Sequence, residues 1–330
     1  MDGKKKKIIL GISIGVIIFI FLNCIHLIWP EPSYELIPRD EAIPDDAVKI
    51  STETDQHPPT LETSFTSIYE DPIPMPGPIN TAGAEDACFI TPDGLQFFFW
   101  FTPDVNRPAG ECVNDGSTGI YNTTWDGAAW AEPERAFLGW NVLDGCPTFF
   151  NDQLWFCSAR NNNPMQMYIA DHNGTDWVNF QRIQDILSQD YDIGELHITD
   201  SGNKIYFADV EEDGLDFNIY VTEKVGGVWQ TPVSVDAVNT EACENQPFVS
   251  EDGTEMWFTR ASTTEGTIGP PEVFRSVWTG SEWGTPEKVI SSLAGEPTLD
   301  NDGNLYFVHH FWDDSSNSML EADIYVCYRK

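Results

Sequence analysis

The stretch Ser250-Glu251-Asp252-Gly253-Thr254-Glu255-Met256-Trp257-Phe258 joins a tight polar turn to an aromatic-rich strand. An Asp-Gly pair tolerates the positive φ of a hairpin turn, and the aromatic residues that follow suit a half-buried strand. Four further stretches pair a turn with such a strand, and the one at Asn151 lacks the glycine: Thr91–Trp100, Asn151–Phe156, Asp200–Phe207 and Asn301–Phe307. Each stretch predicts the hairpin that begins one unit of a repeat.

Two more strands follow in each unit of the repeat. The third strand carries an aliphatic residue or methionine followed by an aromatic residue, at Ile120-Tyr121, Met167-Tyr168, Ile219-Tyr220, Val273-Phe274 and Ile324-Tyr325. The fourth strand begins with a tryptophan, at Trp130, Trp177, Trp229 and Trp283. The last unit lacks its fourth strand, whereas a matching segment at Tyr69-Glu70-Asp71-Pro72 precedes the first unit.

This offset is what a ring closed by its N-terminal strand would show. Units that recur at roughly 50 residues have the length of a four-stranded propeller blade. We therefore predict an all-β fold over residues 67–330: a β-propeller of about five four-stranded blades closed by an N-terminal strand. Six blades are the alternative, and a β-sandwich would leave the offset unexplained.

The repeat resembles the WD40-like propeller repeats of the TolB type, whose units are similar to S-x-D-G-x-x-I-Y-F followed by D-I-Y and W-x-x-P. Ser250–Phe258, Asp323-Ile324-Tyr325 and Trp229-Gln230-Thr231-Pro232 carry this resemblance, which covers residues 69–330. It implies a propeller associated with the cell envelope. These motifs are structural, so the resemblance implies no particular activity.

The N-terminal region predicts a membrane anchor. Residues 8–29 form an uncharged apolar stretch, long enough to cross a hydrocarbon core of roughly 30 Å as one transmembrane helix. Residues 1–7 contain four lysines, so the positive-inside rule predicts a cytoplasmic tail and an extracytoplasmic propeller. Residues 30–66 lack apolar periodicity and predict an extended tether. A cleaved signal peptide, or lipidation at Cys24, is the alternative.

Charge and motif spacing restrict the partners. The chain has 17 basic and 53 acidic residues and a net charge of −36, which would repel the phosphates of nucleic acid and of anionic lipid. We therefore expect no nucleic-acid partner. No cofactor is expected either: Asp213-Gly214 and Asp300-Asn301-Asp302-Gly303 resemble parts of calcium loops without the full spacing, so a structural calcium ion is only the alternative to a turn.

Six cysteines follow the apolar stretch, and their spacing matches no zinc motif. In an exported domain an even number of cysteines permits disulfide bonds. Cys112 and Cys146, which we expect near the same face on neighbouring blades, are the candidate disulfide pair. Buried free thiols are the alternative.

Long loops between second and third strands, at residues 102–118, 260–272 and 309–322, predict one elaborated face of the disc. Two sets of polar residues should gather there, one at the starts of first strands and one at the ends of second strands: Asp86, Asp144, Glu195, Glu244 and Glu296, and Arg160, Asp209, Arg260 and His309. Such a set can bind a polyol, a cationic peptide or a metal ion, or line a water-filled channel.

Aromatic residues divide into two groups in this interpretation. Trp100, Phe311 and Trp312 should be exposed on the loops, where they could stack on a sugar or anchor a protein partner. The repeat tryptophans Trp229, Trp257 and Trp283 should belong to the core. We interpret His309-His310 as an exposed pair without a metal-binding role.

Two functions agree with these features. The leading hypothesis is a non-enzymatic binding or scaffold domain that holds an envelope protein or a glycan outside the membrane. The alternative is a glycoside hydrolase similar to the five-bladed arabinanase-like enzymes, which place an acid on each of the first three blades. Asp86, Asp144 and Glu195 would be the acids, and two carboxylates could divide general-acid and general-base work. The sequence contains no G-x-S-x-G, phosphate-loop or HExxH motif.

Overall fold

The computed structural model describes residues 35–160, 166–183, 193–199, 202–210, 217–264 and 267–330. The predicted cytoplasmic tail (1–7) and transmembrane helix (8–29) lie outside these residues, as does the Asp213-Gly214 turn. Over the described ranges, no helix is long and apolar enough to cross a membrane. The helices found there are short: α2 (Arg39–Ala42), the 3₁₀ helix η1 (Thr63–Phe65) and α3 (Ala109–Cys112).

Antiparallel sheets that follow chain order form the body of the molecule. The first two repeat units are made of β3 (Ala84–Ile90), β4 (Gln96–Thr102), β5 (Gly119–Thr124) and β6 (Glu134–Arg135), and of β7 (Asp144–Phe150), β8 (Gln153–Ser158), β9 (Gln166–His172) and β10 (Trp177–Arg182). The third is made of β11 (Ile193–Thr199), β12 (Lys204–Val210), β13 (Phe217–Val225), β14 (Val228–Trp229) and β15 (Val233–Ser234). The first strand of each unit is its inner strand.

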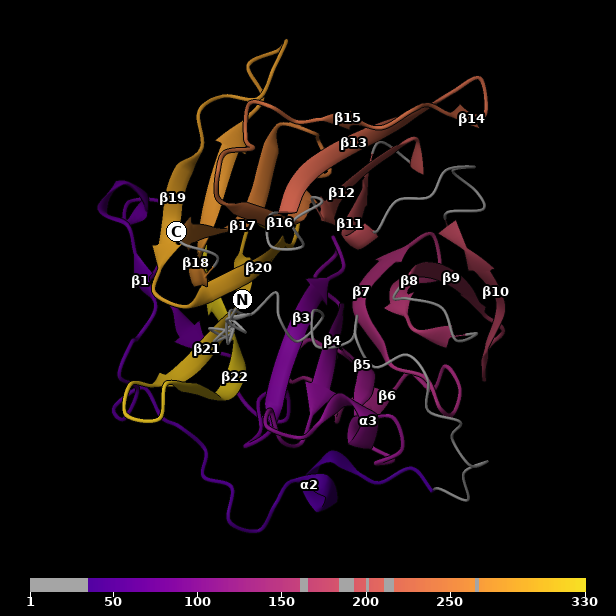
Figure 1. Cartoon of the computed structure of the whole chain (residues 1–330), viewed down its shortest axis with the longest axis vertical. Coiled ribbons are helices and arrows are strands. Elements are labelled where there is room, and N and C mark those ends of the chain that lie inside the picture. Colours follow the sequence, from indigo (N-terminus) through magenta and orange to yellow (C-terminus); the bar gives the residue numbers. More distant parts are fainter. Residues whose placement is uncertain (1–34, 161–165, 184–192, 200–201, 211–216, 265–266) are drawn as a thin grey trace, which may run out of the picture.

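The remaining units complete the ring. The fourth is made of β16 (Cys243–Val249), β17 (Glu255–Thr264), β18 (Thr267–Val277) and β19 (Glu287–Ser291), and the last of β20 (Ala294–Leu299), β21 (Leu305–Asp313) and β22 (Ser318–Cys327). Each inner strand contacts the next in the order β3, β7, β11, β16 and β20, and β20 contacts β3 again. Figure 1 shows the sheets arranged around a common centre. The fold is therefore a β-propeller.

The N-terminal part of the chain supplies the outer strand of the last unit. β2 (Ile73–Pro74) pairs antiparallel with β22, with Ile73 opposite Val326. Tyr69 forms an isolated bridge with Arg329. The strand that the repeat lacks at its C-terminus thus comes from the segment before the first unit, which is the pairing that the sequence offset indicates.

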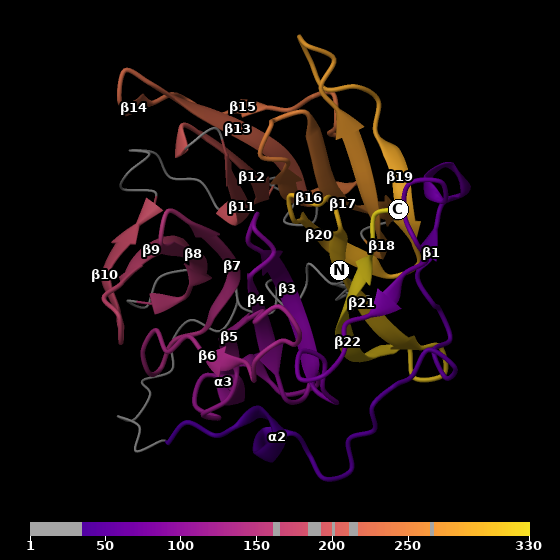
Figure 2. The same cartoon turned by 180° about the vertical axis from the view of Figure 1, so that it is seen from behind.

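Residues 35–66 differ from the free tether predicted for 30–66. They lie along the rim, from α2 beside the first unit to β1 (Thr60–Leu61), which pairs with β19 (Figures 1 and 2). Leu61 and Phe65 are buried, and Lys49 forms ion pairs with Glu321 and Asp323 of β22. A few isolated anchors of this kind produce no apolar periodicity, so the sequence pattern could not reveal the docking.

The core is rich in aromatic residues that pack between the sheets. Trp257 and Trp283 are buried as predicted, and Trp229 is half-buried. Trp100 and Phe311, predicted to be exposed, are only 6% and 1% exposed. They are buried because β4 and β21 continue past them, which places both side chains inside sheets instead of in loops.

Candidate active site

Each inner strand of the propeller contains a β-bulge at the same place. In β3 the pairing register shifts between Asp86 and Phe89, and the other inner strands shift at the equivalent position. Four bulge residues have φ between 49° and 59°, a conformation that non-glycine residues seldom adopt: Ala87, Cys146, Gln246 and Glu296. Bulges re-aim side chains and are frequent beside active sites. Here all four of these residues line one pocket.

A pocket lies where these bulges meet. Its cavity volume is about 50 Å³, and the pocket is partly open to solvent. Three consecutive residues of each inner strand line it, beginning at the bulge: Ala87–Phe89, Cys146–Thr148, Glu195–His197, Gln246–Phe248 and Glu296–Thr298. His197 packs with its ring centroid 4.5 Å from that of Phe248, so the pocket has an aromatic wall in addition to its polar groups.

Three carboxyl groups from three inner strands are called the pocket carboxyl groups below: Glu195 and Glu296 line the pocket, and Asp86, which precedes the lining residues of β3, interacts with both through its charge. Asp86, Glu195 and Glu296 are only 4%, 8% and 6% exposed. Gln246 connects two of them, because its Nε2 donates to Glu296 Oε1 at 2.6 Å and to Glu195 Oε1 at 3.3 Å. His310 Nε2 lies 3.5 Å from Asp86 Oδ1, which is an ion-pair distance without hydrogen-bond alignment.

The environment separates the pKa values of these groups. Burial raises the pKa of Glu195 to about 8, and the charge of Asp86 adds to the effect. Burial, followed by the charges of Asp86 and Glu195, raises the pKa of Glu296 well above its usual range. Burial alone would raise the pKa of Asp86 too, but the interactions with His310, Glu296 and the backbone of Ala87 together outweigh it and lower this pKa. At neutral pH the site therefore combines protonated glutamic acids with an ionised aspartate.

Some polar atoms at the pocket have hydrogen-bonding capacity that is not used within the described residues. Glu296 Oε2, Gln246 Oε1 and His310 Nε2 are buried and have no hydrogen-bond partner there. Buried polar atoms in folded proteins are almost always paired. Acceptors and a ring nitrogen gathered in this way suit the hydroxyl groups of a polar ligand.

Two other predicted site residues belong to structural ion pairs. Asp144 and Glu244 lie two positions before the bulge, and they contact Arg160, which follows β8, and Arg260 of β17. Arg160 Nη2 lies 3.1 Å from Asp144 Oδ1, and Arg260 Nε lies 2.6 Å from Glu244 Oε1. Each arginine also donates to a backbone carbonyl, so these arginine–carboxylate pairs tie the inner strand to the preceding loop.

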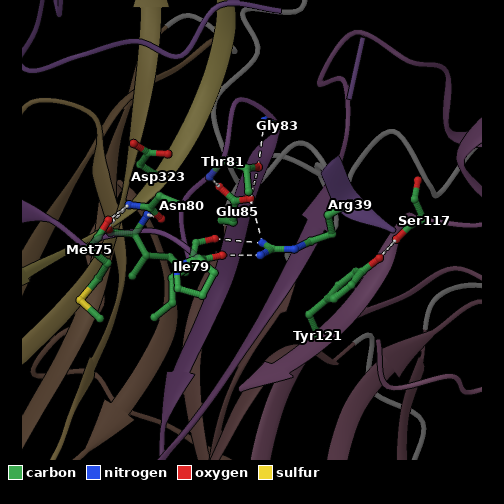
Figure 3. A network of polar contacts seen from close by, with 12 residues as sticks. Arg39, Met75, Ile79, Asn80, Thr81, Gly83, Glu85, Ser117, Tyr121 and Asp323 are labelled. Carbon is green, nitrogen blue, oxygen red and sulfur yellow. Dashed lines mark hydrogen bonds and ion pairs between the residues drawn. The ribbon is translucent and has the colours of Figure 1, made fainter. Parts of the chain in front are cut away.

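The first unit has an equivalent pair whose arginine comes from the rim segment. Arg39 Nη1 lies 3.2 Å from Glu85 Oε1 and donates to the carbonyl of Ile79 at 2.9 Å (Figure 3). Phe101 stands opposite Glu85 in β4, where Arg260 stands opposite Glu244 in β17. Arg39 therefore replaces an arginine that the second strand lacks.

His309, also predicted for the site, contacts the rim segment instead of the pocket. Its Nε2 lies 2.9 Å from Asp55 Oδ2. His309 and His310 are both fully buried, so their prediction as an exposed pair was wrong: β21 carries both into the sheet interior. Asp209 lies opposite Ile193 in the third unit and does not line the pocket.

The predicted disulfide between Cys112 and Cys146 is not present. All six described cysteines are free thiols in the structure. Cys112 lies in the loop after β4, with its Sγ 4.0 Å from Thr102 Oγ1, whereas Cys146 lies 2.9 Å from Cys157. The two predicted partners therefore lie against different neighbours, Cys112 at the end of α3 and Cys146 in the bulge of β7.

The sequence analysis did not assign Gln246 or His310 to the site. It also placed the arginine-paired carboxylates and the pocket carboxyl groups in one set. A signal was available for three bulges, because the bulge residue precedes proline in Cys146-Pro147-Thr148, Gln246-Pro247-Phe248 and Glu296-Pro297-Thr298. Proline restricts the residue before it and cannot donate to a sheet ladder, so its recurrence in an inner strand indicates a bulge. No comparable signal marks His310.

No family model and no curated protein match the chain. Among solved structures, it is similar to an endo-arabinase from Bacteroides thetaiotaomicron, with 14% identity, a TM-score of 0.45, and coverage of 75% of this chain and 94% of that one. It is also similar to GH43B of the xyloglucan PUL of Bacteroides ovatus (13%, TM-score 0.46, 77% and 53% covered). A third is the α-L-arabinofuranosidase of Podospora anserina, solved with cellotriose (10%, TM-score 0.44, 78% and 95% covered).

At these identities the likeness concerns the fold. It agrees with a β-propeller and does not extend to the WD40-like TolB-type repeats that the sequence resembles. The leading prediction of a non-enzymatic binding or scaffold domain is corrected, because the inner strands bring together buried carboxyl groups whose pKa values are shifted in opposite directions, a set suited to acid–base chemistry. The alternative prediction, a glycoside hydrolase, agrees with this set.

Proposed function

We propose that this propeller is a glycoside hydrolase that cleaves its substrate at the central pocket. The observation that supports the proposal is the meeting of the pocket carboxyl groups, whose pKa values are shifted in opposite directions. Most glycoside hydrolases use a protonated and an ionised carboxyl group on either side of the scissile bond. Titratable groups whose pKa values are separated by their surroundings indicate the acid and the base.

Glu195 is the proposed general acid. With a pKa of about 8 it keeps its proton at neutral pH and can donate it to the departing glycosidic oxygen. Cys146 Sγ, 3.7 Å from Glu195 Oε1, and Gln246 hold the carboxyl group in place. Glu195 is only 8% exposed, which shields this proton from bulk water.

Asp86 is the proposed base or nucleophile. Its pKa is lowered, so it stays ionised while Glu195 is protonated. Glu296 retains a proton next to Asp86 and is fixed by Gln246, so we assign it a positioning role toward the Asp86 carboxylate. This set differs from the acids predicted from sequence, because Asp144 is held by Arg160 and Glu296 takes a place in the pocket.

The test is hydrolysis of a panel of aryl glycosides and polysaccharides by the full-length protein. Asp86→Asn and Glu195→Gln should each abolish release of product, because each removes one member of the acid–base pair. Asp302→Asn and Glu251→Gln are matched controls on exposed turns and should retain full activity. Absence of turnover by the wild-type protein on every linkage tested, or equal activity of all four variants, would refute the proposal.

The proposal includes a finer architecture and a location. We propose five blades, because five inner strands contact one another in a closed cycle. We further propose that residues 8–29 anchor the protein in the cell membrane with residues 1–7 in the cytoplasm, so that the propeller meets glycans outside the cell. Protease treatment of intact cells should digest an epitope tag at residue 330 and spare one at residue 1.

A further inference from the structure

Two buried cysteines lie side by side, and one of them, Cys146, lines the pocket. Cys146 occupies the bulge of β7, and Cys157 lies in β8 opposite Gly145. Their Sγ atoms are 2.9 Å apart, closer than two unbonded sulfurs usually approach. The two residues are only 8% and 1% exposed.

We propose that Cys146 and Cys157 are joined by a disulfide bond in the mature protein. An S–S bond is about 2.0 Å long, so the two sulfur atoms need to move together by only about 1 Å. The register of β7 and β8 is interrupted between Gly145 and Thr148, where the bulge breaks the hydrogen-bonded ladder. The bond would join the two strands covalently at that interruption.

Other cysteines near the pocket have different neighbours. Cys88 donates to the carbonyl of Glu296 at 3.4 Å, and Cys112 lies against Thr102. Neither contact resembles the geometry of a disulfide. The structure therefore selects Cys157, and not the Cys112 suggested by sequence, as the partner of Cys146.

The oxidation is a thiol–disulfide exchange. Each thiol gives up one proton and the pair gives up two electrons, which reduce the disulfide of an exported thiol oxidoreductase to two thiols. The contact with Cys157 and burial raise the pKa of Cys146, so little thiolate exists in the finished ring. The exchange should accordingly occur during folding, before the inner strands close around the pocket.

The bond also has a consequence for the site. In the reduced protein the Cys146 thiol can donate to Glu195 Oε1 at 3.7 Å. The disulfide removes this donor and leaves Gln246 as the donor to Glu195. The existence of the bond does not depend on the proposed hydrolase activity, so the two proposals can fail separately.

Peptide mapping tests the proposal directly. The full-length protein is isolated from the cells that produce it, with N-ethylmaleimide present from lysis onward, and is digested by trypsin without reductant. No lysine or arginine lies between residues 136 and 159, so both cysteines stay on the peptide 136–160. We expect this peptide to carry no label before reduction and to accept two labels after it. Two labels before reduction, or a link to the peptide that contains Cys112, would overturn the proposal.

Thermal unfolding gives a second test. A reductant should lower the melting temperature of the wild type and of the Cys112→Ser control by roughly 5 °C or more, because a disulfide stabilises a domain of this size to that extent. The Cys146→Ser/Cys157→Ser double variant should melt at the same temperature with and without reductant. A wild-type melting temperature that does not respond to reductant would contradict the proposal, whether or not the double variant folds.

Discussion

Two sets of buried carboxyl groups lie at nearby positions of the inner strands, and their surroundings differ. Glu85, Asp144 and Glu244 each contact an arginine, which supplies a compensating charge in a poorly hydrated place. The pocket carboxyl groups contact no arginine or lysine among the described residues, and share one glutamine and one histidine. The same residue type thus pairs with a cation in one register and, among the described residues, has none in the other.

This difference depends on the bulge. Residues two positions before the bulge contact arginines, whereas the pocket carboxyl groups come from the residue just before the bulge (Asp86) and from residues within it (Glu195 and Glu296). Left-handed backbone at a non-glycine residue costs roughly 1 kcal/mol or more, so the fold accepts strain at these positions. Strain of this kind is typical of functional sites.

The largest expected effect is on catalytic activity, which should depend on the pocket carboxyl groups and not on the arginine-paired ones. Glu195→Gln should lower kcat by roughly 10²- to 10⁴-fold on a natural glycan, because general acid catalysis is lost. Glu244→Gln should leave kcat within about threefold of the wild type, since its carboxylate serves structure. Steady-state kinetics on the substrate found in the glycoside panel measures both. Equal losses of kcat in the two variants would show that the pocket carboxyl groups and the arginine-paired ones do not differ in function.

The next effect concerns the free energy of unfolding, which should depend on the arginine-paired carboxyl groups. Arg260→Met leaves the fully buried Glu244 carboxylate without its cation and should lower the free energy of unfolding by about 3 kcal/mol. Lys204→Met, which removes an exposed ion pair with Glu223, is the control and should change it by less than about 1 kcal/mol. Urea titration followed by tryptophan fluorescence measures both. A loss for Arg260→Met no larger than that of the control would mean that the buried pair has no structural role.

Residues 35–66 supply Arg39, whose removal should destabilise the fold about as much as the removal of Arg260. Arg39→Met removes the cation beside Glu85, and we expect a destabilisation of about 2 to 3 kcal/mol, close to that of Arg260→Met. The same urea titration measures it. If Arg39→Met unfolds at the urea concentration of the wild type, the docking of residues 35–66 contributes nothing to stability.

Stability should also depend on pH. Burial raises the pKa of Glu85 to about 7 and those of Glu195 and Asp323 to about 8, above the value near 4 of the unfolded chain. Between pH 5 and 8 the folded protein therefore binds more protons, and its stability falls as pH rises, by about 1 kcal/mol per pH unit for each extra proton.

Melting temperatures measured from pH 5.5 to 8.5 test this sign. Glu195→Gln should reduce the slope, because the amide does not titrate, whereas the exposed Glu251→Gln should leave the slope unchanged. A stability that increases with pH over this window would contradict the assigned protonation states.

The sequence predicted the propeller because its signals are local. An Asp-Gly turn, an aromatic strand and a tryptophan at fixed spacing each reflect one hairpin, and Tyr69 before the first unit indicated how the last one is completed. The docking of the rim segment depends on single contacts such as that of Arg39 with Glu85, and no periodic pattern records those.

The candidate site was predictable only in part. Asp86, Glu195 and Glu296 were recognised as acids near the starts of inner strands, but so were Asp144 and Glu244. Their separation follows from a shift of one or two residues at each bulge, which turns one side chain to the pocket and the other to an arginine. His310 reaches Asp86 from a strand over 200 residues away, a contact that only the closed ring creates.

The most direct test of the account compares two leaving groups on the same sugar. Wild-type protein and Glu195→Gln are assayed with an alkyl glycoside, whose leaving oxygen requires a proton, and with a dinitrophenyl glycoside, whose leaving oxygen does not. The account predicts a loss of roughly 10²-fold or more on the alkyl glycoside and a much smaller loss on the dinitrophenyl glycoside. An equal loss on both substrates, or none on either, would show that Glu195 is not the general acid.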